Sequence, residues 1–269
     1  MQVKVYAKLN LTLRVKARQG QFHEIDSMAT SVDLCDVVEV TVRNDNEVHV
    51  TGVDGVKQEQ NTAYRAARAF AEAFATRGVD VAIRKGIPFG GGLGGSSADA
   101  AAVLYCMCKL FGVDVDCEQV RSICEKIGSD ITFMLRGGLG RLRGKGDDVV
   151  FSTLKRPLYF ALTTFAQQMS SREVYEAFDK LATQGAIQQA SSPFFNDLQQ
   201  AARSISNYAE DYLSFAAGHG LNPVMTGSGS AYFVPFEGLA EAQNAVDLLN
   251  RNGFDTVLCQ TEAKGIKVL

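Results

Sequence analysis

Apolar and polar residues alternate along the first part of the chain. From position 3 to position 15 every odd residue is apolar, while most even residues are polar or charged, among them Lys8, Asn10 and Thr12. A period of two is typical of a β-strand with one buried face. The pattern therefore predicts a strand, or a bent pair of strands, over residues 3–16. Lys8, Asn10 and Thr12 are expected together on the face opposite the apolar one.

The rest of the chain alternates between strand and helix patterns. Short stretches rich in β-branched residues predict strands over residues 37–42, 48–50, 79–84, 141–151 (with a turn at 144–146), 159–165, 224–226, 231–236 and 256–260. Apolar residues spaced three and four apart predict a helix from Asn61 or Thr62 to Gly78, then helices over residues 97–111, 116–127, 172–181, 196–217 and 237–251. This alternation, with its long antiparallel parts, predicts an α+β fold. The stretch Lys155-Arg156-Pro157 is the best candidate boundary, and it divides the chain into domains 1–155 and 156–269.

Composition narrows the class of protein. The chain has 269 residues, 46% of them hydrophobic, which is ample for a sizeable core. Its net charge of −3 argues against a general affinity for nucleic acid. No apolar run approaches the roughly 20 residues of a membrane span, and the chain starts directly on a strand pattern without a leader. We therefore expect a cytoplasmic protein with no membrane partner, present as a monomer or weak homodimer. The six cysteines lack zinc-site spacing and are expected to be buried or idle thiols.

A glycine-rich loop between the predicted strand 79–84 and the next helix is the most informative segment. Its residues are Pro88, Phe89, Gly90, Gly91, Gly92, Leu93, Gly94, Gly95, Ser96, Ser97 and Ala98. Glycine permits a positive φ and the close approach of an anion. A helix N-terminus presents free N–H groups and the positive end of the helix dipole. The loop is therefore expected to cradle the phosphates of a nucleoside triphosphate.

Other interpretations of this loop are open. Gly90, Gly92 and Gly95 also fit the dinucleotide fingerprint, which needs an acidic residue about 20 positions further on, at the end of a second strand. Asp114 and Asp116 lie near that distance, but the apolar stretch beside them is too short for a strand. A P-loop would need a lysine before Ser or Thr, and the loop has none. A ligand-free turn is disfavoured because so many glycines cost backbone entropy.

Three motifs match, in order, those of a known kinase family. They are Ala7-Lys8-Leu9-Asn10, the loop 88–98, and Gly227-Ser228-Gly229-Ser230. On these motifs the chain resembles the GHMP family of small-molecule kinases. The resemblance implies a two-lobed fold, with an N-terminal lobe like that of ribosomal protein S5 and a ferredoxin-like C-terminal lobe. It also implies ATP and Mg²⁺ as cofactors, with ATP in the cleft between the lobes.

The resemblance assigns the chemistry to two residues. Asp130 would accept the proton of the substrate hydroxyl, and Lys8 would hold that carboxylate and the hydroxyl beside the γ-phosphate. Ser97 is the candidate protein contact of Mg²⁺. By itself the sequence also allows Lys8 to be a solvated strand lysine and Asp130 to be the N-cap of the next helix. The family usually has Val-Pro after this aspartate, whereas Ile131-Thr132 stands here, which is expected to loosen the turn.

Further matches run along the whole chain and indicate the substrate. They are Phe22-His23, Asn61, Gly128-Ser129-Asp130, Ser171 with Val174-Tyr175, and Asn196-Asp197-Leu198. The resemblance then implies a cytidine diphosphate-linked methylerythritol of the non-mevalonate isoprenoid route. Phe22 and Tyr175 would stack on the two faces of the cytosine, and His23 would bond to its edge. The expected substrate-binding set is completed by Asn10, Gly227, Ser228 and Gly229.

Three competing functions remain open. The first is another GHMP kinase, acting on homoserine or mevalonate, whose small aliphatic substrate would need no aromatic clamp. The second is a nucleotide-binding regulatory protein without catalysis, which the presence of both Lys8 and Asp130 disfavours. The third is an NAD-dependent oxidoreductase, which the glycine loop disfavours. Arg141 and Arg143 either contact phosphates or are solvated.

Overall fold

The computed structural model describes residues 1–20, 22–187 and 192–269. Its strands are β1 (Gln2–Gln19), β2 (Phe22–Val42), β3 (Val48–Thr51), β4 (Val79–Arg84), β5 (Leu139–Gly144), β6 (Asp148–Ser152), β7 (Tyr159–Thr163), β8 (Phe195–Asn196), β9 (Val224–Met225), β10 (Tyr232–Phe236), β11 (Thr256–Glu262) and β12 (Ile266–Val268). Its helices are η1 (Gln58–Gln60), α1 (Thr62–Phe74), α2 (Gly95–Phe111), α3 (Glu118–Ile127), α4 (Ile131–Arg136), α5 (Ser171–Thr183), α6 (Leu198–Ile205), α7 (Glu210–Gly218) and α8 (Leu239–Arg251). The predicted α+β class is confirmed.

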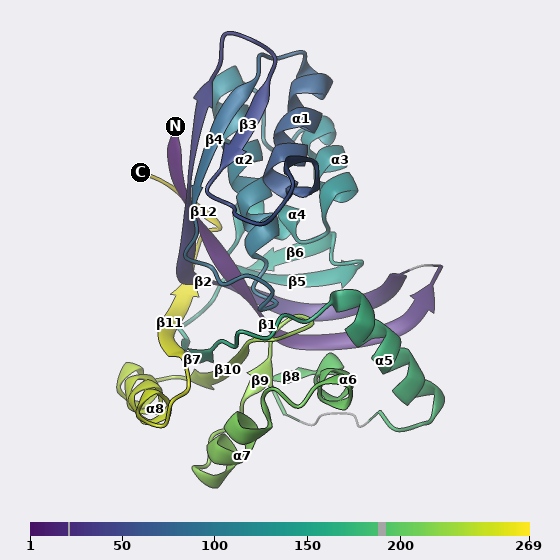
Figure 1. Cartoon of the computed structure of the whole chain (residues 1–269), viewed down its shortest axis with the longest axis vertical. Helices are drawn as coiled ribbons and strands as arrows, with labels where there is room; N and C mark the ends of the chain where they lie inside the picture. The colour runs from purple at the N-terminus through teal and green to yellow at the C-terminus, as the bar shows by residue number, and fades with distance from the viewer. Residues whose placement is uncertain (21, 188–191) are drawn as a thin grey trace.

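Two long strands run through the whole molecule. β1 and β2 pair as a curved antiparallel hairpin (Figure 1). The pairing register shifts after Tyr6, after Asn10 and after Val15. Such bulges bend a strand and re-aim its side chains. The segment that carries Lys8 and Asn10 lies between the first two shifts.

One core fills the part of the molecule drawn at the top of Figure 1. There β2 also pairs with β4 and β5, and helices α1 to α4 lie on one side of these strands (Figure 1). The apolar positions of β1 face a helix, α2, that is buried along most of its length. The buried side chains on the two elements are Val3, Val5, Ala7 and Leu9 on β1, and Ala98, Ala100, Ala101, Ala102, Val103 and Leu104 on α2. The small alanines let the helix approach the sheet closely.

A second core lies in the lower part, between the strands β7, β9 and β10 and the helices α5 to α8. Its largest buried side chains are Tyr212 and Tyr232. The C-terminal strands connect the two parts, because β11 pairs with both β2 and β7, and β12 pairs with β1. Strands from both sides of residue 155 thus share one continuous sheet. The division into domains 1–155 and 156–269 stays a prediction.

The structure differs from the sequence-based elements at five places. β2 begins at Phe22 rather than at residue 37, and helix α4 and strand β12 were not predicted. The single helix expected over residues 196–217 is instead the short strand β8 followed by α6 and α7. Helix α1 ends at Phe74, where Ala75 adopts a left-handed φ of 49°, and not at Gly78. The sequence does not predict that the helix ends there, because glycine, not alanine, is the usual residue in that conformation.

The structure also describes the apolar helices and the cysteines. Across the described residues, no helix is both long and apolar enough to cross a membrane. All six cysteines are free thiols, and burial raises the pKa of Cys106, Cys108, Cys124 and Cys259 to about 12. Thiols with such pKa values stay protonated and inert, which agrees with the idle thiols expected from the sequence.

Candidate active site

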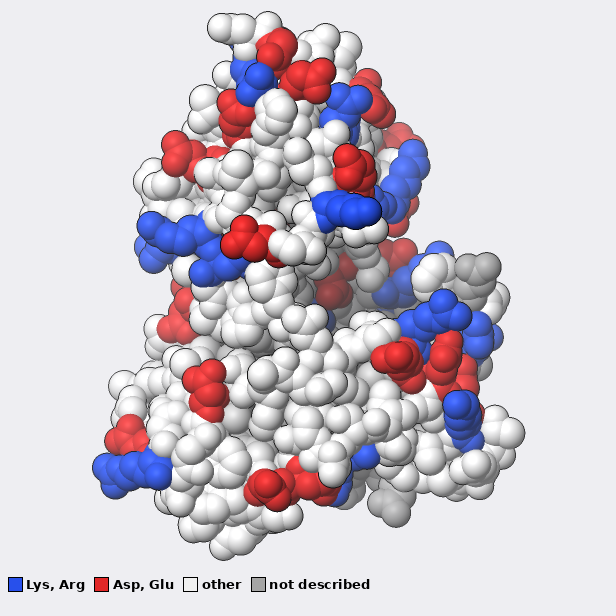
Figure 2. All heavy atoms as spheres, in the orientation of Figure 1, with Lys and Arg blue, Asp and Glu red and all other residues white. Residues whose placement is uncertain are grey.

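A cavity of about 970 Å³ opens between the glycine loop, the β1–β2 hairpin and α5. Figure 2 shows the surface hollowed in this region, between the upper part of the molecule and the part formed by α5 at the lower right. Every residue that the sequence analysis assigned to ATP, substrate, metal or catalysis lines this cavity except Ala98, which is buried within α2. The fold therefore brings together residues that are up to 221 positions apart, from Lys8 to Gly229.

Lys8 is held by acceptors on its own strand and across the cavity. Its side chain is only 6% exposed, so it is not a solvated surface lysine. Its Nζ donates to Asn10 Oδ1 at 2.6 Å and lies 3.3 Å from Asp130 Oδ2. The Asn10 amide donates in turn to Ser27 Oγ on β2 at 2.8 Å. Since an unpaired buried charge is costly, these contacts fix the ammonium beside the carboxylate.

Asp130 occupies the N-cap position of α4, but its side chain makes no capping hydrogen bond. The carboxylate is 28% exposed and faces Lys8 and the cavity instead. Ile131, which stands where the family usually has valine, is fully buried, and Thr132 continues the first turn of α4. The loosening of this turn by the missing proline stays a prediction.

The glycine loop presents its backbone to the cavity. Gly90, Gly92 and Gly94 have φ values of 69°, 74° and 75°, which favour glycine. Helix α2 begins at Gly95, two residues earlier than predicted, and Gly94 at its N-cap has no side chain to satisfy the first N–H groups. These donors and the helix dipole are available to an anion in the cavity. A Cβ on Gly94 would approach Lys8 Cγ to 3.1 Å, so the loop and the lysine are in close contact.

A second glycine turn packs on the first. Ser230 and Ala231 donate their backbone N–H groups to Gly90 O and Gly91 O at 3.1 and 3.2 Å. A Cβ on Gly227 would lie 2.8 Å from Gly92 O, which leaves no room for a side chain. The two turns therefore depend on each other for their positions.

Asn196 and Ser171 fix the second turn from outside. Asn196 Nδ2 donates to Met225 O at 2.7 Å and to Gly227 O at 2.8 Å. Ser228 Oγ shares a hydrogen bond of 2.7 Å with Ser171 Oγ at the start of α5. The motif residue Asn196 thus supports the backbone of the cavity without lining it.

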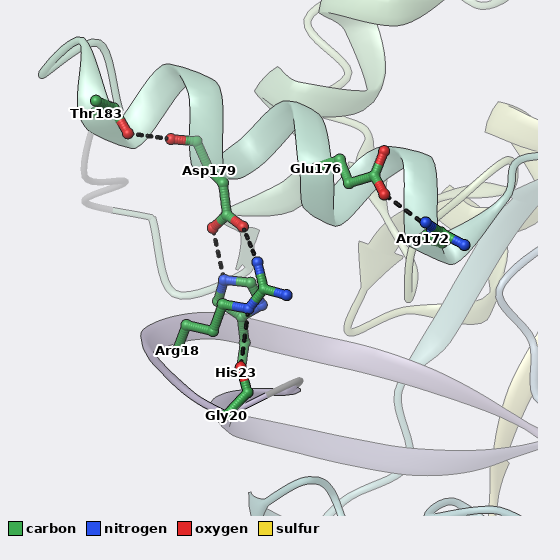
Figure 3. A network of polar contacts seen from close by, with 7 residues as sticks. All are labelled: Arg18, Gly20, His23, Arg172, Glu176, Asp179 and Thr183. Atoms are coloured by element: carbon green, nitrogen blue, oxygen red, sulfur yellow. Dashed lines mark hydrogen bonds and ion pairs between the residues drawn. The ribbon is translucent and has the colours of Figure 1, made fainter.

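The tip of the β1–β2 hairpin meets one face of α5 in a polar cluster (Figure 3). His23 Nε2 lies 2.6 Å from Asp179 Oδ1, and Arg18 Nη1 lies 3.3 Å from Asp179 Oδ2. The His23 ring stacks on Tyr175 with centroids 5.1 Å apart, and Phe178 meets its edge at 6.1 Å. Because a carboxylate only accepts hydrogen bonds, the proton between them belongs to His23 Nε2.

Phe22 and Tyr175 lie in different surroundings within the cavity. Phe22 is 55% exposed, and Lys145 Nζ sits 4.6 Å from its ring centroid. Burial, together with the charge of Asp130, raises the pKa of Tyr175 to about 12, so its hydroxyl stays protonated. Tyr175 stacks instead on His23. Stacking of Phe22 and Tyr175 on the two faces of a base stays a prediction.

Sequence reasoning missed a buried charge cluster beside the glycine loop. Lys85 Nζ donates to Asp36 Oδ2 at 2.5 Å and to Asp99 Oδ2 at 2.7 Å. The other oxygen of Asp36 accepts from the N–H groups of Gly86 and Ile87. Burial raises the pKa of Asp99 to about 7. In the sequence, this cluster is indicated by Asp99, an aspartate within the largely apolar helix α2.

Other missed cavity residues are Arg18, Lys145, Arg172 and Asp179. Each lies in a loop, hairpin tip or helix face whose polar residues look like ordinary surface positions in sequence.

Conversely, neither Arg141 nor Arg143 lines the cavity, and Arg141 pairs with Asp26 at 2.6 Å. No group of three or more His, Cys, Asp or Glu suited to a metal occurs among the described residues.

The geometry suits transfer of a phosphoryl group to a hydroxyl. A carboxylate lies beside a fixed ammonium, and both adjoin the glycine loop with the free N–H groups at the start of α2. Phosphoryl transfer asks the protein mainly for positioning and electrostatic stabilisation. An aromatic and histidine surface in the same cavity is available to a flat ring.

Comparisons with known proteins agree with this chemistry. Residues 61–140 match the model of the GHMP kinases N terminal domain. The chain is 28% identical to 4-diphosphocytidyl-2-C-methyl-D-erythritol kinase of Clostridium beijerinckii, covering 97% of this chain and 100% of that protein. It is 32% identical to the protein of the same name from Polaromonas naphthalenivorans, covering 84% of this chain and 82% of that protein. A crystal structure of 4-(cytidine 5'-diphospho)-2C-methyl-D-erythritol kinase superposes with a TM-score of 0.77 at 27% identity, covering 97% of this chain and all of that chain.

Proposed function

We propose that this chain, which belongs to the GHMP kinase family, transfers the γ-phosphate of ATP to the 2-hydroxyl of 4-diphosphocytidyl-2-C-methyl-D-erythritol. That reaction is a step of the non-mevalonate route to isoprenoid precursors. The observation that carries the proposal is the single cavity, which joins the Lys8–Asp130 pair and the glycine loop to the ring surface of Phe22, His23 and Tyr175. The near full-length relatives of this activity support the same substrate.

In the proposed reaction Asp130 takes the proton of the 2-hydroxyl. The hydroxyl oxygen then forms a bond to the γ-phosphorus, the bond from that phosphorus to the bridging oxygen breaks, and ADP leaves with the electron pair. Lys8, 3.3 Å from Asp130 Oδ2, keeps the carboxylate oriented and offsets charge that develops on the transferring group. Asn10 accepts from Lys8 and so keeps the ammonium from turning away.

The residues present fit Mg²⁺ carried on the phosphates of ATP. Mg²⁺ is usually held by one or two protein oxygens together with substrate phosphates and waters. Ser97, in the first turn of α2, lines the cavity beside the phosphate cradle and would supply such an oxygen. When bound, Mg²⁺ neutralises the charge of the phosphates.

The alternative within the family is a kinase of homoserine or mevalonate. Their small aliphatic acids offer no flat ring to Phe22 and Tyr175, and no ring edge to His23. The buried stacking of His23 on Tyr175 therefore favours the cytidyl substrate. Both kinase types would use Lys8 and Asp130 in the same way.

ADP release measured with the cytidyl substrate, homoserine and mevalonate in parallel tests the choice. We expect turnover with the cytidyl substrate alone. Base stacking is worth roughly 1–3 kcal/mol per base, so Phe22→Ala should raise the KM for the cytidyl substrate by about 5- to 150-fold and leave that for ATP unchanged. Phe22→Tyr keeps the ring and should be tolerated. Turnover of homoserine or mevalonate, with none of the cytidyl substrate, would contradict the proposal.

A further inference from the structure

The cations of the cavity are almost all neutralised by carboxylates. Its lysines and arginines are Lys8, Arg18, Lys85, Lys145 and Arg172. Four of them form ion pairs: Lys8 with Asp130, Arg18 with Asp179, Lys85 with Asp36 and Asp99, and Arg172 with Glu176. Within the described part of the chain, Lys145 is the one cavity cation whose ammonium has no carboxylate partner.

Lys145 lies at the tip of the turn between β5 and β6. Its backbone N–H donates to Asp147 Oδ1 at 3.1 Å, which shapes the turn, and its ammonium sits over the Phe22 ring, 4.6 Å from the centroid. The next residue, Gly146, lies against the segment that carries Asp130, because a Cβ on Gly146 would be 3.6 Å from Ser129 Oγ. The turn therefore touches both the ring of Phe22 and the neighbour of the proposed base.

We infer that Lys145 binds the diphosphate of a nucleoside diphosphate-linked substrate. The inference rests on the proposed function, which places a base against Phe22 and the reacting hydroxyl beside Asp130. In such a substrate the diphosphate connects the base-bearing sugar to the polyol, so it must lie between these two points, where the Lys145 turn stands.

The charge balance of the cavity supports this assignment. Any of the four paired cations would have to share or lose a carboxylate to bind an anion, whereas Lys145 exchanges only a ring contact and water. An ammonium–phosphate hydrogen bond is charge-assisted and stronger than a neutral one. The triphosphate of ATP has its own donors in the glycine loop and the start of α2.

Binding of cytidine, cytidine monophosphate and cytidine diphosphate, measured by calorimetry with the ATP site saturated by ADP, separates the base from the phosphates. We expect Lys145→Gln to weaken cytidine diphosphate about tenfold, as for loss of one hydrogen bond to a charged group, and to leave cytidine unchanged. Lys145→Arg should retain most of the affinity. Lys155→Gln, the same charge change at an exposed lysine outside the cavity, is the matched control and should behave as wild type.

The outcomes are distinct. Equal cytidine diphosphate affinity in wild type and Lys145→Gln would overturn the role of Lys145 while leaving the proposed function intact. An equal loss for cytidine and cytidine diphosphate would overturn it as well, because the lysine would then act on the base. A wild-type chain that binds neither ligand would overturn the proposed function, and this inference with it. A salt dependence of cytidine diphosphate binding that is steeper in wild type than in Lys145→Gln would further support the assignment.

Discussion

At the scale of single residues, the proposed function depends on a few side chains held in unusual environments. A lysine on a strand is normally solvated, yet the Lys8 ammonium is buried between Asn10 and Asp130. An aspartate at an N-cap normally bonds to its own helix, yet Asp130 leaves that role unfilled. Both departures make sense if the two groups act together on a ligand, since local stability alone would favour the ordinary arrangement.

The proposed role of Asp130 as a base leads to a prediction about turnover. Asp130→Asn keeps the size of the side chain but removes its ability to take a proton, so we expect kcat to fall by about 10²- to 10⁴-fold. ATP binding should survive, because the carboxylate acts only when the hydroxyl loses its proton. Steady-state kinetics and nucleotide binding measure the two effects separately. Asp148→Asn, at an exposed position of β6, is the control. Retention of more than about a tenth of wild-type kcat would rule Asp130 out as the base.

At the scale of elements, α5 and the β1–β2 hairpin depend on each other. Tyr175, Phe178 and Asp179 are spaced three and four apart, so they share one face of α5, and all three contact His23. Arg18, paired with His23 across the hairpin, binds the second oxygen of Asp179. The helix face thus sets both the position of the hairpin tip and the orientation of the histidine ring (Figure 3).

This contact predicts that Asp179 positions His23. Asp179→Leu keeps the branched shape of the side chain but leaves the His23 Nε2–H without an acceptor, at a cost of about 1–3 kcal/mol. We expect nitrogen NMR of the imidazole to show loss of the fixed Nε2–H form. The KM for the cytidyl substrate should rise about 5- to 150-fold, the range that corresponds to this cost, while the KM for ATP stays constant.

Two further variants serve as a conservative substitution and a control for that prediction. Asp179→Asn retains a carbonyl acceptor and should preserve the Nε2–H form. Glu173→Gln changes an exposed carboxylate of the same helix outside the cavity and should have no effect. An unchanged imidazole spectrum in Asp179→Leu would show that the ring is held by stacking alone.

At the scale of the whole molecule, a charge cluster lies deep within the larger core. Asp36 and Asp99 are both buried and share the ammonium of Lys85, which ties β2 and β4 to α2 through the segment after β4. One oxygen of Asp99 has no hydrogen-bond partner among the described residues. Two carboxylates therefore compete for one ammonium in a poorly solvated place, and burial raises the pKa of Asp99 to about 7.

A raised pKa makes stability depend on pH in a defined direction. Between the ordinary aspartate pKa of 3.8 and the folded value of about 7, the folded chain binds more protons at Asp99 than the unfolded chain does. The contribution of Asp99 to stability is therefore full below pH 3.8 and is lost as the pH rises toward 7.

The variant Asp99→Asn isolates this contribution. We expect the free energy of unfolding of wild type, relative to that of Asp99→Asn, to decline as the pH is raised from about 4 to 7. Urea denaturation of both chains across that range measures the difference, in which the carboxylates common to both chains cancel. Asp148→Asn, with its exposed carboxyl, is the control. A difference that stays constant or increases with pH would contradict the placement of an ionisable Asp99 in this cluster.

Local patterns in the sequence determined a large part of this protein. The period of two in β1, the alanine-rich helix α2 and the glycine loop follow from backbone and burial preferences that each segment expresses by itself. Short motifs also pointed to Lys8, Asp130 and the glycine loop, and the structure places all of them at one cavity. In the same way, the mixture of elements was enough to indicate the α+β class.

Tertiary contacts decided the rest. The first half of β2, residues 22–36, carries buried Ser27, Thr30 and Ser31, so it lacks an alternating pattern and becomes a strand only because β1 and β5 pair with it. The charge partners of the cavity also come from distant parts of the chain: Asp179 for His23 and Asp36 for Lys85. Whether a charged side chain is solvated, paired or left free depends on which groups the fold places within a few ångströms, and no local pattern records those distances. For that reason the sequence could point to the residues that we propose react, while only the three-dimensional structure could single out Lys145 as the unpaired cation among the described residues of the cavity.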